Sequence, residues 1–120
     1  MVIAFYVIAG LAALAFLAAG LMKLARPKDA LKQNGMGWVD DFSASAVKLI
    51  GLAEVLGALG LILPGVTGIA PVLSPVAGIC LVALMIGAVL VHNRRKEPAG
   101  PAIGLAALAA VATVLGFLVI

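Results

Sequence analysis

The chain has 120 residues, of which 65% are hydrophobic and 11% are charged. Water-soluble domains have about 45–50% apolar and about 25% charged residues, so this composition excludes an ordinary soluble domain and indicates a membrane protein. The net charge is +3, but the basic residues cluster beside apolar stretches and no aromatic residues alternate with them. Nucleic-acid binding is therefore not indicated, and attraction to anionic lipid headgroups explains the basic clusters.

Four apolar stretches follow one another along the chain. Each has close to the ~20 residues that a helix needs to cross the hydrocarbon layer. The first is expected to be retained as a span, because it lacks a basic leading segment and exceeds the roughly 7–15 apolar residues of a signal sequence. We therefore predict an all-α bundle of four transmembrane helices, which forms a single membrane domain over residues 1–120. The expected spans are residues 2–22, 44–63, 75–94 and 101–120.

The loops between these stretches differ in charge. Basic residues follow the first and third stretches, in loops 23–43 and 95–100, whereas residues 64–74 contain no ionisable side chain. An even number of spans places both basic loops on one side, and loops rich in Lys and Arg stay in the cytoplasm, so both termini are expected to be extracytoplasmic. The basic residues of the two loops are Lys23, Arg26, Lys28, Lys32, Arg95 and Lys96.

Local chemistry predicts where the helices begin and end. Pro64–Gly65 predicts the end of the second helix. Ser74–Pro75 predicts the start of the third, with the serine hydroxyl as N-cap and the proline ring at the first helical position. Glycine and alanine recur in all four stretches, which predicts close packing of the helices.

Glu54 is the ionisable residue deepest in the expected spans. With the second helix beginning at Ala44, it lies about 15 Å into the bilayer, near its midplane. An acid there costs about 2.5–3.5 kcal/mol to insert, so it needs compensation. Its helical neighbours Gly51, Gly57 and Ala58 are small, which predicts that it faces another helix. Two interpretations stay open: a neutral structural acid that hydrogen-bonds a neighbouring helix, and a ligand-binding or proton-linked site.

Three further polar residues lie close to the ends of the spans. Lys23 ends the first span, and Lys48 lies six residues before Glu54, too far around the helix to pair with it directly. Both are expected to extend to the headgroups, although Lys23 can also bend inward. His92 lies in the last turn of the third helix, where a protonated imidazole suits the helix dipole. A headgroup contact is expected for His92, with a ligand or proton role as the alternative.

The residues that are absent narrow the chemistry. One cysteine, Cys80, and one histidine, His92, cannot supply a thiol pair, a structural zinc site or two histidine haem ligands. The sequence also contains no P-loop and no dinucleotide-binding fingerprint. We therefore expect no intrinsic cofactor, although a quinone or lipid can bind, and no enzymatic activity of the chain on its own.

Three segments resemble a known family. GLMKL at residues 20–24, GLAEVLGALGLILPG at residues 51–65 and GAVLVHNRRKE at residues 87–97 are similar to the DoxX-like family of small four-helix membrane proteins. The resemblance implies a bacterial inner-membrane protein. Some relatives are linked to thiosulfate or quinone oxidoreduction, others to redox-stress complexes or to chaperoning another membrane protein. The polar positions that match are Lys23, Glu54 and His92.

Two classes of function follow from these observations. The first is an accessory or interaction subunit of a larger membrane complex, respiratory or linked to redox stress. The second is a bundle that binds a quinone-like or sterol-like apolar ligand near Glu54 and contributes to quinone-linked oxidoreduction. A proton-linked carrier is a third, which would need oligomerisation because the spans have one central ionisable residue. The expected partners are membrane lipids and either another membrane protein or further copies of the chain.

Overall fold

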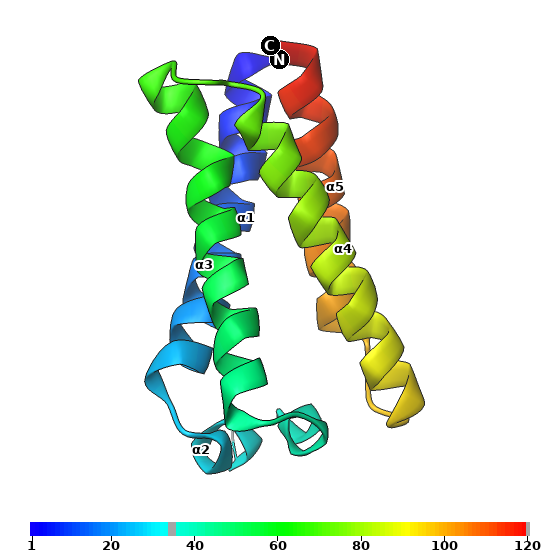
Figure 1. Cartoon of the computed structure of the whole chain (residues 1–120). Coiled ribbons are helices and arrows are strands. Elements are labelled where there is room, and N and C mark those ends of the chain that lie inside the picture. Colours follow the sequence, from blue (N-terminus) through cyan, green and yellow to red (C-terminus); the bar gives the residue numbers. More distant parts are fainter. Residues whose placement is uncertain (34–35, 120) are drawn as a thin grey trace.

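The computed structural model describes residues 1–33 and 36–119, which form helices and no strand. Within these residues, four helices are long and apolar enough to cross a membrane, which confirms the predicted all-α four-helix bundle. Two short helices lie between the first two long ones (Figure 1). The elements are α1 (Val2–Ala25), α2 (Lys28–Gln33), the 3-10 helix η1 (Gly37–Asp41), α3 (Ala44–Thr67), α4 (Leu73–Arg94) and α5 (Gly100–Val119).

The four long helices form a closed ring. α1 packs most extensively against α3, and α4 against α5, while contacts of α1 with α5 and of α3 with α4 complete the ring. The N-terminus and the end of α5 lie side by side, at the end of the bundle that also holds the α3–α4 connection (Figure 1). Residue 120 of the expected fourth span lies outside the described residues.

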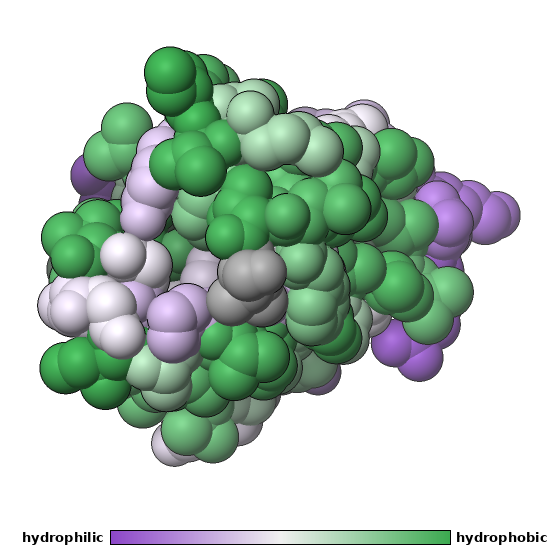
Figure 2. All heavy atoms as spheres, turned by 90° about the horizontal axis from the view of Figure 1, so that it is seen from above, coloured by the Kyte–Doolittle hydropathy of each residue, from purple (hydrophilic) through white to green (hydrophobic). Residues whose placement is uncertain are grey.

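The two ends of the bundle differ in polarity. α2, η1 and the α4–α5 connection lie at the end opposite the termini, which we name the charged end (Figure 1). Viewed from the other end, the surface is mainly hydrophobic, and the strongly hydrophilic residues appear only at its periphery (Figure 2). The fold therefore gathers the two basic loops at one end, as the alternation of spans predicts.

α3 continues through Pro64 to Thr67, so the predicted end of this helix at Pro64–Gly65 was wrong. Proline removes the hydrogen bond to the carbonyl four residues earlier, but here this loss falls near the end of the helix. The Thr67 hydroxyl donates to the Leu63 carbonyl at 2.7 Å and supports the last turn. Gly68, in the left-handed conformation with φ 73°, then ends the helix.

Ser74 lies inside α4, which begins at Leu73, so the predicted N-cap role of Ser74 was wrong. Its buried hydroxyl instead donates to the Leu61 carbonyl of α3 at 2.6 Å and joins α3 to α4. A buried hydroxyl needs a hydrogen-bond partner. The Leu61 carbonyl, three residues before Pro64 in the neighbouring helix, is that partner. At the start of α3, Ser43 is an N-cap whose side chain accepts from the Ala46 N–H at 3.0 Å.

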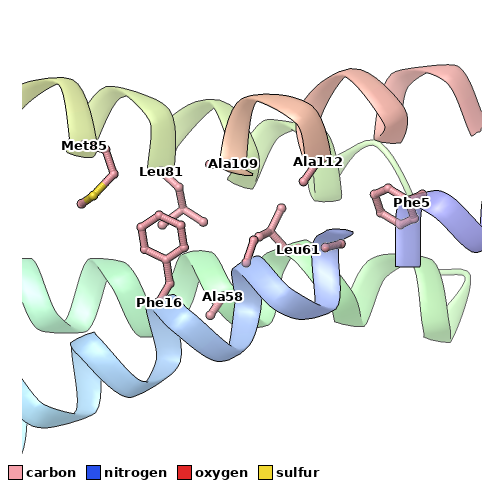
Figure 3. Packing of buried hydrophobic residues seen from close by; sticks show 10 residues of the cluster. Phe5, Phe16, Ala58, Leu61, Leu81, Met85, Ala109 and Ala112 are labelled. Carbon is pink, nitrogen blue, oxygen red and sulfur yellow. The ribbon is translucent and has the colours of Figure 1, made fainter. Parts of the chain in front are cut away.

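The bundle interior combines small and large apolar side chains. Phe16 of α1 and Leu81 of α4 point into the centre, with Leu61 of α3 beside them (Figure 3). Alanines from α1, α3 and α5 fill the narrow places between these larger residues. Because lipid tails are as apolar as these side chains, the packing stabilises the bundle through close contact of surfaces rather than through escape from water.

Candidate functional site

The acid of α3 and the lysine in the last turn of α1 form a buried ion pair. Glu54 is 1% exposed and Lys23 is 7% exposed. Lys23 Nζ donates to Glu54 Oε1 at 2.5 Å. The expectation that Lys23 extends to the headgroups was therefore wrong, and its alternative, an inward bend, is what the structure has. Pairing satisfies both charges at once, whereas a lysine at the headgroups would leave the acid without a cationic partner.

Two glycines bring the helices close enough for this pair to form. A methyl group on Gly20 would lie 2.6 Å from the Gly51 carbonyl oxygen, so the backbones of α1 and α3 touch at this point. Gly20 precedes Lys23 by three residues, and Gly51 precedes Glu54 by three. Residues three apart lie on the same face of a helix, so the glycine contact places both charged side chains at one interface.

Trp38 of η1 lies beside the ion pair. Its ring centroid is 5.7 Å from Lys23 Nζ, which places the ammonium in a cation–π contact. The Trp38 ring meets Phe42 edge to face, with 5.7 Å between ring centroids. Both aromatic residues pack against a second apolar cluster formed by Leu31, Val39 and Val47. α2 and η1 therefore fold back onto the charged end and help to bury Lys23.

Lys48 has a different partner from Lys23. It is exposed, and its ammonium donates to the Leu24 carbonyl at 2.9 Å. That carbonyl belongs to the last turn of α1, where carbonyl oxygens lack partners within the helix. The Lys48 side chain thus caps the end of α1 and does not pair with Glu54.

His92 belongs to a second polar cluster at the charged end. Its Nδ1 is 3.4 Å from Glu97 Oε1 and has no hydrogen-bond partner among the described residues. The same Glu97 oxygen accepts from Arg95 Nε at 3.1 Å, and Arg95 Nη1 donates to Asp41 Oδ1 at 3.0 Å. The hydrogen bond to Asp41 raises the pKa of Arg95. This cluster joins the α4–α5 connection to η1.

The structure brings two of the three predicted site residues together. Lys23 and Glu54 pair, whereas His92 lies with Glu97, and no ion pair or hydrogen bond between described residues joins the two clusters. The sequence alone did not identify Trp38 or Arg95 as partners, because Trp38 is distant in sequence from Lys23 and Arg95 is distant from Asp41. The matched spacing of Gly20 with Lys23 and of Gly51 with Glu54 is the signal that points to the ion pair.

The ion pair places one carboxyl group and one ammonium group inside an apolar bundle. Because the two groups pair with each other and are buried, they stabilise the contact of α1 with α3 and present little polarity to the lipid-facing surface. No group of three or more His, Cys, Asp or Glu residues suited to a metal ion occurs in the part of the chain that is described. The site is therefore a buried ion pair at the interface of α1 and α3.

The fold and this pair define a small integral membrane protein with four transmembrane helices. A sequence profile of the DoxX-like family matches residues 7–115, and the chain therefore belongs to the DoxX-like family. This confirms the resemblance carried by the three sequence segments. No curated protein and no solved structure matches the chain.

Proposed function

We propose that the chain is an accessory subunit that binds another integral membrane protein through α4 and α5. The observation that carries the proposal is a groove of ≈ 380 Å³ between these helices on the outer surface of the bundle. Its lining is apolar except for one threonine. The residues are Ile79, Val82, Ala83 and Ile86 of α4 with Ala110, Thr113 and Val114 of α5.

The groove suits a transmembrane helix of a partner. Ala83 and Ala110 are small, and small residues let a second backbone approach closely in lipid. The Thr113 hydroxyl donates to the Ala109 carbonyl at 2.8 Å, so its hydrogen is not free for a polar ligand. Shape and apolar contact, rather than a polar group, would therefore select the partner. The proposed assembly is a larger membrane complex, respiratory or linked to redox stress, as the resemblance to the DoxX-like family implies.

The proposal includes an orientation in a bacterial inner membrane. Both connections rich in Lys and Arg lie at the charged end, and the α3–α4 connection has no ionisable residue (Figure 1). The positive-inside tendency supports a cytoplasmic charged end and extracytoplasmic termini.

A second candidate function is the binding of a quinone-like or sterol-like molecule near Glu54. It is supported by the Lys23–Glu54 pair, which places a buried donor and a buried acceptor at the interface of α1 and α3. A carbonyl or hydroxyl compound bound there would have to replace Lys23 or Glu54 as a hydrogen-bond partner. Any redox chemistry would then be supplied by the ligand and by a partner protein.

The test is photo-crosslinking in native membranes, with a photoreactive amino acid at Ala83 or Ala110. Leu14 of α1, which is 67% exposed, is the control position on a helix that does not line the groove. We expect the groove positions, and not the control, to cross-link to one integral membrane protein. Native mass spectrometry of the gently solubilised assembly should show that protein in a stoichiometric complex.

Other outcomes would overturn the accessory role. Crosslinks to a second copy of the chain would replace it with a homo-oligomer. A chain that forms no protein crosslinks but retains an apolar molecule during native mass spectrometry would favour the second candidate. Filling the groove by Ala83→Phe should abolish the crosslink from Ala110, whereas Leu14→Phe should leave it unchanged.

A further inference from the structure

A second groove, with different chemistry, opens at the charged end. Its volume is ≈ 320 Å³, and it lies between the end of α1, the start of α2 and the beginning of α3. One carboxylate, that of Asp29, lines it together with four cationic side chains. The cationic residues are Lys23, Arg26, Lys28 and Lys48.

The groove carries an excess of positive charge. Of its four cationic groups, Glu54 offsets that of Lys23 and Asp29 offsets a second, which leaves two in excess. Like charges gathered in one concave site repel each other, and a bound anion relieves that repulsion. The charge balance therefore indicates an anionic ligand.

Two of the lysines are held in place by the protein backbone. Lys28 Nζ donates to the Phe42 carbonyl at 2.6 Å, and Lys48 Nζ donates to the Leu24 carbonyl at 2.9 Å. An ammonium group has three donors, so each lysine keeps donors for a ligand. Because the two side chains are already held in the protein, binding costs less conformational entropy than binding to free surface lysines.

The surroundings of the groove are apolar as well as basic. Val47 in its lining is buried. Leu52 and Leu56 follow Lys48 at intervals of four residues, on the same face of α3, and are 43% and 59% exposed. A ligand with a phosphate group in the groove can therefore lay an apolar tail along α3.

We infer that this groove binds the phosphate group of an anionic phospholipid. The headgroup phosphate accepts hydrogen bonds from Lys28, Lys48 and Arg26, and an acyl chain follows Leu52 and Leu56. This site lies on α1, α2 and α3, whereas the groove proposed for a partner protein lies on α4 and α5. The inference is therefore independent of the proposed accessory role.

The test is native mass spectrometry of the purified full chain with defined lipids. The probes are phosphatidylglycerol, which is anionic, and phosphatidylcholine, which is zwitterionic. We expect the chain to prefer phosphatidylglycerol about tenfold, as suits a site with two excess positive charges. No preference between the two lipids would overturn the inference.

A matched pair of variants shows whether the preference arises in the groove. Ala44→Glu adds a carboxylate to the lining, at the first residue of α3, where an acid is compatible with the helix dipole. Ser45→Glu adds the same charge to an exposed residue about 100° around the helix and outside the lining. Ala44→Glu should lower the preference at least about fivefold and Ser45→Glu less than about twofold. Equal losses would indicate only diffuse attraction and would contradict a specific site.

Two further arms complete the design. If Ala44→Glu does not fold, Arg26→Gln, compared with Arg94→Gln at the same end, gives the same contrast.

Inorganic phosphate and glycerol phosphate should not displace the lipid at millimolar concentration. If they do, and if the displacement depends on Arg26, the ligand is a free phosphate and the assignment to a lipid is wrong. Crosslinking from Ala110 should be unaffected by Ala44→Glu, so failure of either proposal is visible separately.

Discussion

Gly20 and Gly51 touch backbone to backbone where α1 packs against α3. A methyl group on Gly51 would lie 2.8 Å from the Gly20 carbonyl oxygen and 2.8 Å from Lys23 Cβ. Both distances are shorter than side chains allow, so the glycine pair fixes how closely the helices approach. This contact lies three residues from Lys23 and from Glu54, and it thereby sets the geometry of the ion pair.

Gly51→Ala should therefore destabilise the bundle. Crowding of a closely packed interface costs about 1–3 kcal/mol, and here the obstacle is backbone rather than a flexible side chain. Equilibrium unfolding with sodium dodecyl sulfate in mixed micelles measures this cost. Gly104→Ala is the control, since a methyl group there would meet nothing within 4 Å. If both variants unfold at the same detergent fraction, the glycine contact does not limit the packing of α1 and α3.

Glu54→Gln should also be strongly destabilising. The change leaves the Lys23 ammonium buried without its counter-charge, and breaking one half of a buried pair costs about 3–5 kcal/mol. Lys23→Met combined with Glu54→Leu removes both charges and should recover most of that stability. Glu97→Gln, at an acid that is only partly buried, is the matched control. Thermal unfolding of the four purified proteins gives the comparison, and a Gln variant as stable as the native chain would show that Glu54 acts as a neutral acid.

The exposed ion pair between Lys32 and Asp40 should make the stability of the folded protein depend slightly on pH in the acid range. Its atoms are 2.9 Å apart, and the hydrogen bond from Lys32 lowers the pKa of Asp40 below its ordinary value. A lowered folded-state pKa contributes stability that is fully present above the unfolded-state pKa of about 3.9 and is lost as pH falls through the folded-state pKa. Carboxyl NMR titration should show this depressed pKa, and Lys32→Gln should raise it. An unchanged titration curve in Lys32→Gln would refute the contact.

The orientation of the bundle can be tested with single cysteines in a Cys80→Ser background. Gln33 and Thr67 are both exposed and lie at opposite ends of the molecule. Because basic loops stay in the cytoplasm, Thr67→Cys should react with a membrane-impermeant maleimide added to intact cells. Gln33→Cys should react only after the cells are permeabilised. The reverse pattern would place the charged end outside.

The spans were predictable because a membrane imposes a length and a polarity on each helix. Composition and loop charge thus predicted four helices and the location of both basic loops at one end, and the matching sequence segments predicted the family. The ends of the helices were less predictable. Pro64 remains within α3, where its missing hydrogen bond falls near the end of the helix. Ser74 lies within α4, where its hydroxyl forms a contact between helices that a linear pattern does not contain.

The site was predictable only in part. The position of Glu54 among small residues predicted that it faces a helix, and it is buried against α1. The partner was not predicted, because an extended lysine can reach either the headgroups or the interior. The choice depends on how α1 and α3 are offset along their axes, and the Gly20–Gly51 contact fixes that offset. The position of His92 beside Glu97 was likewise not predictable from the sequence, because it depends on the path of the short α4–α5 connection.

The position of Trp38 beside the buried ion pair affects the intrinsic fluorescence of the protein. It is the single tryptophan of the chain, and its ring lies 5.7 Å from the Lys23 ammonium. The electronic states of indole respond to a nearby positive charge, so the emission wavelength of the native protein depends on where that ammonium lies. Any event that separates Lys23 from Glu54, or η1 from the end of α1, would shift the emission wavelength of the intrinsic fluorescence. The state of the buried pair can thus be followed in unlabelled protein, in a bilayer and in real time.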